Sequence, residues 1–437
     1  MLRNSVRLVG AAAVILLTVS GCGLSSGDTG GQKSEAGAPT GKVTGQISFQ
    51  TLQLKPDFDK YINGVITDFQ TQNPGTKVNW VDIPFKGAQE RLVTDATAGT
   101  LPDVVNLNPN FAQPLEKKGL FLDLSKAAPT AQAKYVTGAW DSFQIPGQSG
   151  SYGFPWYLTS EVTMYNKDLF TKAGLDPATP PATFEALWAD ASKLATAGSG
   201  KFYGLHPALE NKFITDLAKL GVPLLNKEGT KWTFNTPEAV AYVDRLTAMY
   251  KAGVMPKDSL TQTHAEEIEA YQAGRIALFP SGPNFLKIIK ENAPAIAKAT
   301  GVGPQITGPH GVANMSVMGL LVPKTGKNQA TALAFADFMT NAKNQVAFSK
   351  IVTVLPSVTD ALKDPYFTDV SDGTTQSQAR KISAAQIPKA VNQVPVQFDD
   401  RIKAVVIGKI QLAMQGKLTS QAALDQAVKE ADLITGS

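Results

Sequence analysis

Two spacings of hydrophobic residues follow one another along the chain after residue 43. Residues 46–51 (QISFQT) alternate and are rich in strand-forming types, which predicts a β-strand. Phe58, Ile62 and Val65 then recur at intervals of three and four, which predicts a helix that Asn73-Pro74-Gly75 ends. The first five predicted elements are a strand at 46–51, a helix at 57–72, a strand at 77–83 that is buried on both faces, a helix at 88–98 and a strand at 103–107. This alternation indicates a largely parallel sheet flanked by helices.

The second half of the chain shows the same two patterns. Thr236-Pro237-Glu238 combines a cap residue, a proline at the first helical position and an acid in the first turn, which is typical of a helix start. The further predicted elements are helices at 236–253, at 330–340 and from 419 or 420 to the end, with buried strands at 275–279 and 316–322. With about 395 residues after the N-terminal region, the body is long enough for two domains.

The N-terminus has the layout of a secretory signal. Arg3 and Arg7 precede an apolar run over 8–19, and small residues then lead to Cys22. The run is short for a membrane span, although an ordinary N-terminal anchor is the alternative. Residues 17–22 (LTVSGC) resemble a bacterial lipobox, which implies a signal peptide at 1–21 and lipid on Cys22. More than one acyl chain gives lasting attachment, and the Gly- and Ser-rich segment 22–42 is predicted to be a flexible tether.

Composition excludes several classes of function. Hydrophobic residues make up 43 % of the chain and no second long apolar run follows, so a soluble body is expected. The formal charge falls from +4 to +2 when Arg3 and Arg7 are removed with the signal, and no basic stripe exists, which argues against a nucleic-acid partner. Because Cys22 is the only cysteine, the body holds neither a disulfide nor a thiolate–zinc site.

Enzymatic motifs are absent. No nucleophile elbow, no H-E-x-x-H pair and no phosphate-binding loop occurs. The histidines at 206, 264 and 310 are far apart in sequence, and a surface or loop position is the simplest interpretation of each. Glu266 and Glu267 are adjacent on a predicted helix start and point about 100° apart, so a solvated helix start is expected rather than a glycosidase pair. The sequence predicts no catalytic residue, no metal and no cofactor.

Three loops carry side chains that suit a sugar. Phe154-Pro-Trp-Tyr157 is followed by Glu161, 106–110 (NLNPN) follows a predicted strand, and 281–285 (SGPNF) follows another. Ligands bind open α/β sheets at the carboxyl ends of strands, where rings can cover C–H faces and amides can pair with hydroxyls. The alternative, left open by the pattern, is that Trp156 and Tyr157 are core residues.

Several segments resemble the extracellular solute-binding proteins of sugar ABC importers. They are 162–175 (VTMYNKDLFTKAGL), 181–187 (PATFEAL), 99–105 (GTLPDVV), 234–240 (FNTPEAV), 271–278 (YQAGRIAL), 355–357 (LPS) and 416–424 (GKLTSQAAL). Each is weak alone, but their order covers the chain from the signal to the last helix. The resemblance implies the type II fold of periplasmic binding proteins of the maltose-binding kind, with two α/β lobes and a ligand cleft between them. It places the N-terminal lobe at 43–156 plus 312–352 and the C-terminal lobe at 157–311 plus 353–437.

The resemblance also implies the activity and the partners. The expected protein is a non-enzymatic, monomeric lipoprotein on the outer face of the bacterial cell membrane. It would capture a mono- or oligosaccharide by hinge closure and deliver it to the permease and ATPase of an ABC importer. The same scaffold could instead bind a non-sugar solute such as a polyol phosphate, a metal chelate or a peptide. An alternative from another class is a lipid-anchored glycan-degrading enzyme that uses Glu161.

Position against the family's motifs selects the binding residues. The predicted set is Gln53, Asn108, Asn110, Trp156, Tyr157, Glu161, Trp232, Asn284, Phe285 and Asn314. This chain departs from the family at Asn284, where relatives often carry a tryptophan that stacks on sugar. Either Phe285 or Trp232 then supplies the ring, or stacking is weaker at that subsite.

Overall fold

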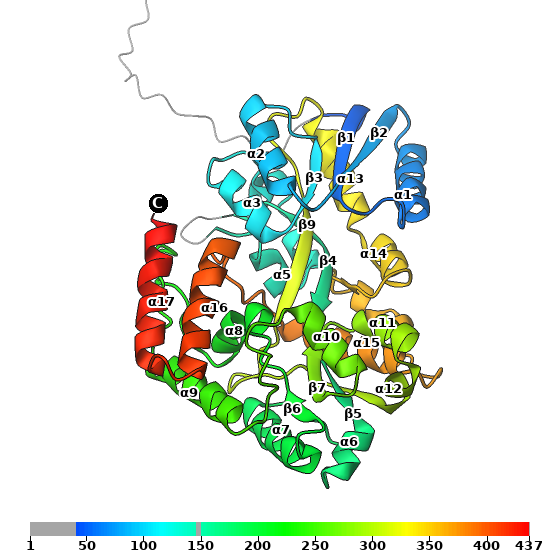
Figure 1. The fold of residues 1–437 in the computed structure, drawn as a ribbon. Helices are drawn as coiled ribbons and strands as arrows, with labels where there is room; N and C mark the ends of the chain where they lie inside the picture. The colour runs from blue at the N-terminus through cyan, green and yellow to red at the C-terminus, as the bar shows by residue number, and fades with distance from the viewer. Residues whose placement is uncertain (1–40, 146–149, 437) are drawn as a thin grey trace, which may run out of the picture. The chain divides into compact units, whose positions relative to one another are not determined.

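The structure, a computed structural model, describes residues 41–145 and 150–436 and contains two separate sheets (Figure 1). The first has six strands in the order β10 (Leu355–Pro356), β4 (Phe154–Ser160), β9 (Met315–Leu321), β3 (Val104–Leu107), β1 (Gly45–Leu52) and β2 (Thr76–Ile83). The second has four strands in the order β6 (Tyr203–Leu205), β7 (Ile276–Ser281), β5 (Val162–Asn166) and β8 (Thr300–Gly303).

Strand pairing in both sheets is mixed rather than largely parallel. The parallel pairs are β1–β2, β1–β3 and β6–β7. The remaining pairs are antiparallel, and each of them includes β4, β9 or β5, the strands next to the points where the chain passes from one sheet to the other. Strand β2 differs from its prediction as well: it lies at the sheet edge and is only partly buried.

Helices cover both sheets. Around the first sheet lie α1 (Asp59–Gln72), α2 (Ala88–Ala98), α3 (Pro109–Glu116), α13 (Gln329–Met339) and α14 (Ala342–Ser349). Around the second lie α7 (Phe184–Gly198), α8 (Leu209–Lys219), α9 (Pro237–Lys251), α10 (His264–Gln272), α11 (Phe285–Asn292), α15 (Thr375–Gln386), α16 (Asp400–Met414) and α17 (Ser420–Thr435). Helix α9 begins as predicted, since the Thr236 hydroxyl accepts from the Ala239 N–H and Pro237 follows it.

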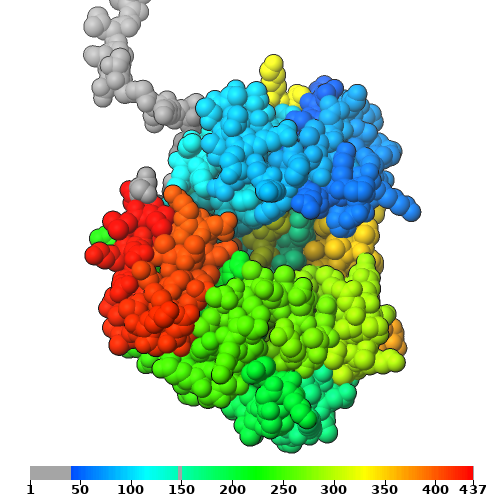
Figure 2. Space-filling view, viewed as in Figure 1, coloured from blue at the N-terminus to red at the C-terminus, as the bar shows by residue number. Residues whose placement is uncertain are grey.

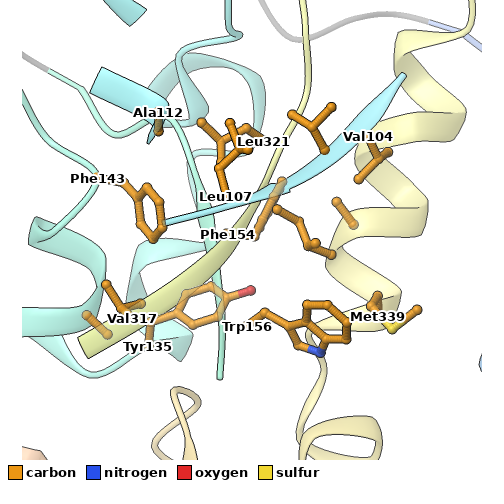
Figure 3. Packing of buried hydrophobic residues seen from close by; sticks show 14 of the residues in the cluster. Val104, Leu107, Ala112, Tyr135, Phe143, Phe154, Trp156, Val317, Leu321 and Met339 are labelled. Carbon is orange, nitrogen blue, oxygen red and sulfur yellow. The ribbon is translucent and has the colours of Figure 1, made fainter. Parts of the chain in front are cut away.

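Each sheet has its own hydrophobic core. The six-stranded sheet packs through one cluster that includes Phe49, Trp156 and Phe335, and Figure 3 shows Trp156 within this core beside Met339. The four-stranded sheet is covered on both faces, because Leu278 packs in one cluster with the α7–α9 helices while Phe279 packs in another with α10 and α11. Two cores with separate helices are what positions a cleft between the sheets.

The chain passes between the sheets at three places. Glu161 alone separates β4 from β5, and residues 304–314 connect β8 to β9. The third connection leads from β10 to α16 by way of α15, which packs on the second sheet. It runs beside the second passage at residue 391, where the Val391 carbonyl accepts from the Met315 N–H at 3.0 Å. Asn314 is fixed there, since its N–H donates to Gln305 Oε1 at 2.6 Å.

The strand pairing places two lobe boundaries at positions other than the predicted ones. The prediction ended the first N-terminal segment at 156, but β4 continues to pair with β9 as far as Ser160, opposite Met315. It also assigned everything after 352 to the C-terminal lobe, but β10 pairs with β4 in the six-stranded sheet. The buried Ile387 belongs to that sheet's core too. The pairing of β4 with β9 and with β10, which short motifs do not reveal, sets both limits.

The signal, Cys22 and the predicted tether up to residue 40 lie outside the described residues. Among the helices of the described part of the chain, none is long and apolar enough to cross a membrane.

Candidate functional site

A cavity of about 500 Å³, here named the central cleft, is lined from both sheets. On the face shown in Figure 2, a hollow lies between the blue and cyan surface of the first sheet's helices and the green surface that includes α10. Its lining comprises Thr159, Ser160, Glu161, Asn211, Lys212, His264, Pro280, Ser281, Gly282, Asn284, Phe285, Asn314, Ser316 and 352–354. The lining combines hydroxyl and amide side chains with charged and apolar ones and with the phenyl ring of Phe285.

A second cavity of about 880 Å³, here named the outer groove, adjoins the central cleft and shares Asn211 with it. Its walls come from the start of α2 and α3 on one side, with Phe85, Asn108 and Asn110. On the other side they come from α8 and from residues 394–403. The two cavities meet at Asn211, and each presents both polar and apolar surface.

Four of the predicted binding residues meet in the central cleft: Glu161, Asn284, Phe285 and Asn314. They come from the β4–β5 passage, from the end of β7 and from the β8–β9 passage, which are far apart in sequence. Asn314 serves the passage as well as the cleft, because its side-chain oxygen accepts from the Gln393 N–H at 3.0 Å and its carbonyl accepts from Gln305 Nε2 at 3.1 Å. Asn314 thus braces two of the three passages.

Asn108 and Asn110 lie in the outer groove instead. The Asn108 side chain caps α3 by accepting from the Phe111 N–H at 2.9 Å, so its oxygen is already engaged. Gln53 is exposed immediately after β1, with a backbone φ of 53°, and it lines neither cavity.

Trp156 and Tyr157 are placed in the core of the first sheet. Trp156 is fully buried, stacks on Phe348 at 5.5 Å between ring centroids and meets Phe49 edge-on. Tyr157 is half-buried against Trp156 and Phe348, and burial raises the pKa of its hydroxyl. Neither ring lines the central cleft or the outer groove. The stacking role predicted for Trp156 is not available to a ring with no exposed face, and the core interpretation fits.

Trp232 is likewise buried, 2 % exposed, in the core beside the second sheet. Its ring meets Phe234 and Phe398 edge-on and its indole N–H donates to the Thr435 hydroxyl at 2.9 Å. Of the two rings predicted to replace the tryptophan expected at Asn284, Phe285 therefore lies in the central cleft and Trp232 does not.

Sequence reasoning missed a linked group of polar residues at the cleft wall. Glu267 is fully buried, in contrast to the solvated helix start predicted for it, and its carboxylate contacts Lys212 and His264. One signal was present in the sequence: Thr263 and Glu266 form a capping box, which fixes the start of α10. Residues three apart share a helix face, so that start places His264 beside Glu267. The partner Lys212, 55 residues away, gives no such signal.

Glu161 belongs to a buried charged cluster at the β4–β5 passage. Lys219 Nζ lies 3.1 Å from Glu161 Oε2 and 4.0 Å from Asp216 Oδ1, and its side chain is 3 % exposed. Burial raises the pKa of Asp216 to about 6, although the Lys219 ammonium opposes this rise. The Tyr242 hydroxyl donates to Asp216 Oδ2 at 2.8 Å. Lys219 is thus neutralised from both sides and fixes Glu161 where the chain changes sheets.

The His206 and Glu161 side chains, considered above for catalysis, have partners within the protein. Within residues 41–145 and 150–436, no group of three or more His, Cys, Asp or Glu is placed to hold a metal ion. His206 is buried, its Nδ1 accepts from the Ala208 N–H at 3.0 Å, and burial lowers its pKa. Glu161, proposed above as the alternative acid, is paired with a lysine rather than with a second carboxylate.

Solved structures define the class of protein. A candidate oligosaccharide periplasmic-binding protein from Synechococcus sp. MITs9220 is 30 % identical to this chain and superposes with a TM-score of 0.76, covering 89 % of this chain and 99 % of that one. The fold is that of the type II periplasmic binding proteins, as predicted.

The family follows from a match to the bacterial extracellular solute-binding proteins over residues 55–346, which is more than half of the chain. This chain belongs to that family. The sn-glycerol-3-phosphate-binding periplasmic protein UgpB of Escherichia coli (strain K12) is 24 % identical over 405 residues, covering 86 % of this chain and 89 % of UgpB. A Streptomyces antibioticus protein described as an uncharacterized lipoprotein is 25 % identical over 382 residues, covering 82 % of this chain and 78 % of that protein.

Proposed function

We propose that this protein captures a mono- or oligosaccharide in the central cleft and delivers it, unchanged, to the permease and ATPase of an ABC importer. The observation that carries the proposal is the lining of the cleft by hydroxyl, amide and aromatic side chains that come from both sheets. Such groups pair with sugar hydroxyls and cover apolar C–H faces. The sugar-binding name of the Synechococcus relative agrees with this lining.

The two sheets with their separate cores act as two lobes. We place two lobe limits at Ser160 and at Asn314, and the third between β10 and α16, where α15 packs on the second sheet and Ile387 in the core of the first. A ligand in the cleft contacts both lobes at once only when they are close together, so it shifts the population toward the closed form. The closed monomer would then be the form that the permease recognises. This mechanism makes and breaks no covalent bond in the ligand.

A thermal-shift screen tests the proposed ligand class. We expect one or more of maltose, maltotriose, trehalose and D-tagatose to raise the unfolding midpoint of the purified protein. At a hundredfold excess over the Kd, a ligand that binds only the folded state adds roughly 2.7 kcal/mol of stability. The control ligands are sn-glycerol 3-phosphate and a mixture of amino acids, and each is expected to leave the midpoint unchanged.

Three results would contradict the proposal. The first is a larger shift with sn-glycerol 3-phosphate than with any sugar, and the second is no shift with a broad sugar panel. The third is turnover of an oligosaccharide that stops when Glu161 is replaced by glutamine, since this would favour a glycan-degrading enzyme.

We also propose that lipid on Cys22 anchors the protein to the outer face of the cell membrane. The lipobox-like sequence at 17–22 supports this, and so does the Streptomyces relative described as a lipoprotein. The substitution Cys22→Ser is expected to move the protein from the membrane fraction to the soluble extracytoplasmic fraction, because it removes the acyl chains that give lasting attachment. Immunoblots of the fractions measure the change. An unaltered membrane fraction would instead indicate an uncleaved N-terminal anchor.

A further inference from the structure

A buried carboxylate lies behind one wall of the central cleft. Glu267 on α10 has no exposed surface, and each of its oxygens has one partner. Oε1 accepts from Lys212 Nζ at 2.7 Å and Oε2 accepts from His264 Nδ1 at 2.8 Å. Lys212 and His264 line the cleft, whereas Glu267 does not. The carboxylate therefore fixes two cleft side chains from behind without itself being available to a ligand.

The contact with Glu267 determines which nitrogen of the neutral His264 ring carries the proton. An ionised carboxylate only accepts hydrogen bonds, so Nδ1 carries a proton. Burial alone would raise the pKa of Glu267, but the Lys212 ammonium and the His264 ring together hold that pKa below its usual value. In the neutral ring, Nε2 is then an acceptor, and it lies 3.3 Å from Ser281 Oγ. The Ser281 hydroxyl can donate to the ring and keep its oxygen lone pairs for another donor.

Aromatic packing holds the same ring in place. His264 lies nearly parallel to Phe279 at 5.9 Å and meets Phe285 edge-on at 5.1 Å. Phe279 is fully buried, while Phe285 lines the cleft. The imidazole of His264 and the phenyl ring of Phe285 are thus parts of a single packed unit.

Both charged side chains of this wall have a partner of opposite charge within the protein. The Lys212 side chain is 12 % exposed and is paired with Glu267, while Glu161, the other charged residue of the lining, is paired with Lys219. A phosphate or carboxylate ligand needs an uncompensated cation or a set of free donors. A Lys212 ammonium that is already neutralised by a buried carboxylate still has protons to donate, but it offers little net charge.

We propose that Lys212, His264 and Ser281, positioned by Glu267, form a subsite that binds hydroxyl groups of an uncharged sugar next to the ring of Phe285. This assignment rests on the function proposed above and narrows its range of ligands, because the subsite would favour neutral sugars over sugar phosphates and acidic sugars. Lys212 donates to a ligand oxygen, and the Ser281 oxygen accepts from a ligand hydroxyl. His264 keeps the serine hydroxyl directed, and Glu267 acts only as a positioning residue.

Isothermal titration of the full-length protein in detergent tests the subsite with whichever of maltose, maltotriose, trehalose and D-tagatose binds the wild type most tightly. We expect Lys212→Met and Ser281→Ala each to weaken binding by about tenfold or more, the effect of losing a buried hydrogen bond to a charged or well-placed partner. The matched control is Glu269→Gln, which changes an exposed carboxylate on α10, the helix that carries His264 and Glu267. This control is expected to change the Kd by less than twofold. sn-Glycerol 3-phosphate is expected to bind at least tenfold more weakly than that sugar.

A spectroscopic measurement tests the positioning role separately from folding. Side-chain ¹⁵N spectra are expected to show His264 protonated at Nδ1, with a shift of its Nε2 signal when the sugar is added. The exposed His310 serves as the internal control and is expected not to shift. The variant His264→Phe keeps a ring between Phe279 and Phe285, so a tenfold loss of affinity in a variant with normal unfolding would support the polar role.

The outcomes separate the two proposals. If a sugar binds the wild type but Lys212→Met and Ser281→Ala keep its affinity within twofold, the subsite is overturned and the proposed function stands. If sn-glycerol 3-phosphate binds more tightly than every sugar, or if no sugar binds, both proposals fall.

Discussion

Replacing Trp156 with alanine is expected to lower the free energy of unfolding by about 3–5 kcal/mol, the usual range for removing a large buried aromatic side chain. The indole has no exposed surface, and it packs between Phe348, stacked at 15° to it, and the edges of Phe49 and Tyr157. The cavity would lie in the middle of a core formed by β1, β4 and α14, which the surrounding strands cannot close without breaking their pairing.

Urea unfolding followed by circular dichroism measures this loss. The matched control is Trp188→Ala, since Trp188 on α7 is only half-buried and packs against Phe184 and Tyr242. Trp188→Ala should lower the free energy of unfolding clearly less than Trp156→Ala does. If Trp156→Ala unfolded like the wild type but no longer bound any sugar, the stacking role predicted from the sequence would be restored and the packing described here would be wrong.

Local patterns predicted the elements well, because helices and strands leave their own periodicity in the chain. The helix predicted at 88–98 has those limits in the structure, and Ile62, Val65 and Phe69 are buried along α1 as their spacing indicates. Capping signals worked for the same reason, as at Thr236, where the cap lies within four residues of the groups that it satisfies.

Features that depend on distant neighbours were not predictable in this way. The motif at 154–157 contains two rings beside a proline, and either a core or a cleft position is compatible with it. Only the position of β4 between β9 and β10 shows that Trp156 is covered on all sides. Strand β2 was expected to be buried on both faces, but the order of strands places it at an edge. Membership of a family could be read from ordered motifs, whereas the cleft positions of Lys212 and His264, which lie outside those motifs, could not.

The substitution Glu267→Gln is expected to cost about 3–5 kcal/mol of unfolding free energy at pH 7, as is usual when one partner of a buried ion pair is removed. The amide can still accept from one neighbour, but the Lys212 ammonium would be left without a counter-charge at a site where its side chain is only 12 % exposed. Glu269→Gln, on the same helix but exposed, is expected to change stability by less than about 0.5 kcal/mol.

Two further measurements distinguish a lost ion pair from general damage to the core. The double variant Lys212→Met with Glu267→Gln should be more stable than Glu267→Gln alone, because no unpaired charge then remains. The coupling free energy between the two substitutions should exceed about 1 kcal/mol.

The pH dependence of stability has a definite sign. The pKa of Glu267 is depressed in the folded state, so its contribution is present above the ordinary glutamate pKa and is lost as the pH falls through the folded value. The wild type should therefore lose its advantage over Glu267→Gln on acidification. An advantage that stayed constant from neutral pH to acid, together with additive single costs in the double variant, would mean that Glu267 contributes by packing and that its charge does not hold Lys212 and His264 at the cleft wall.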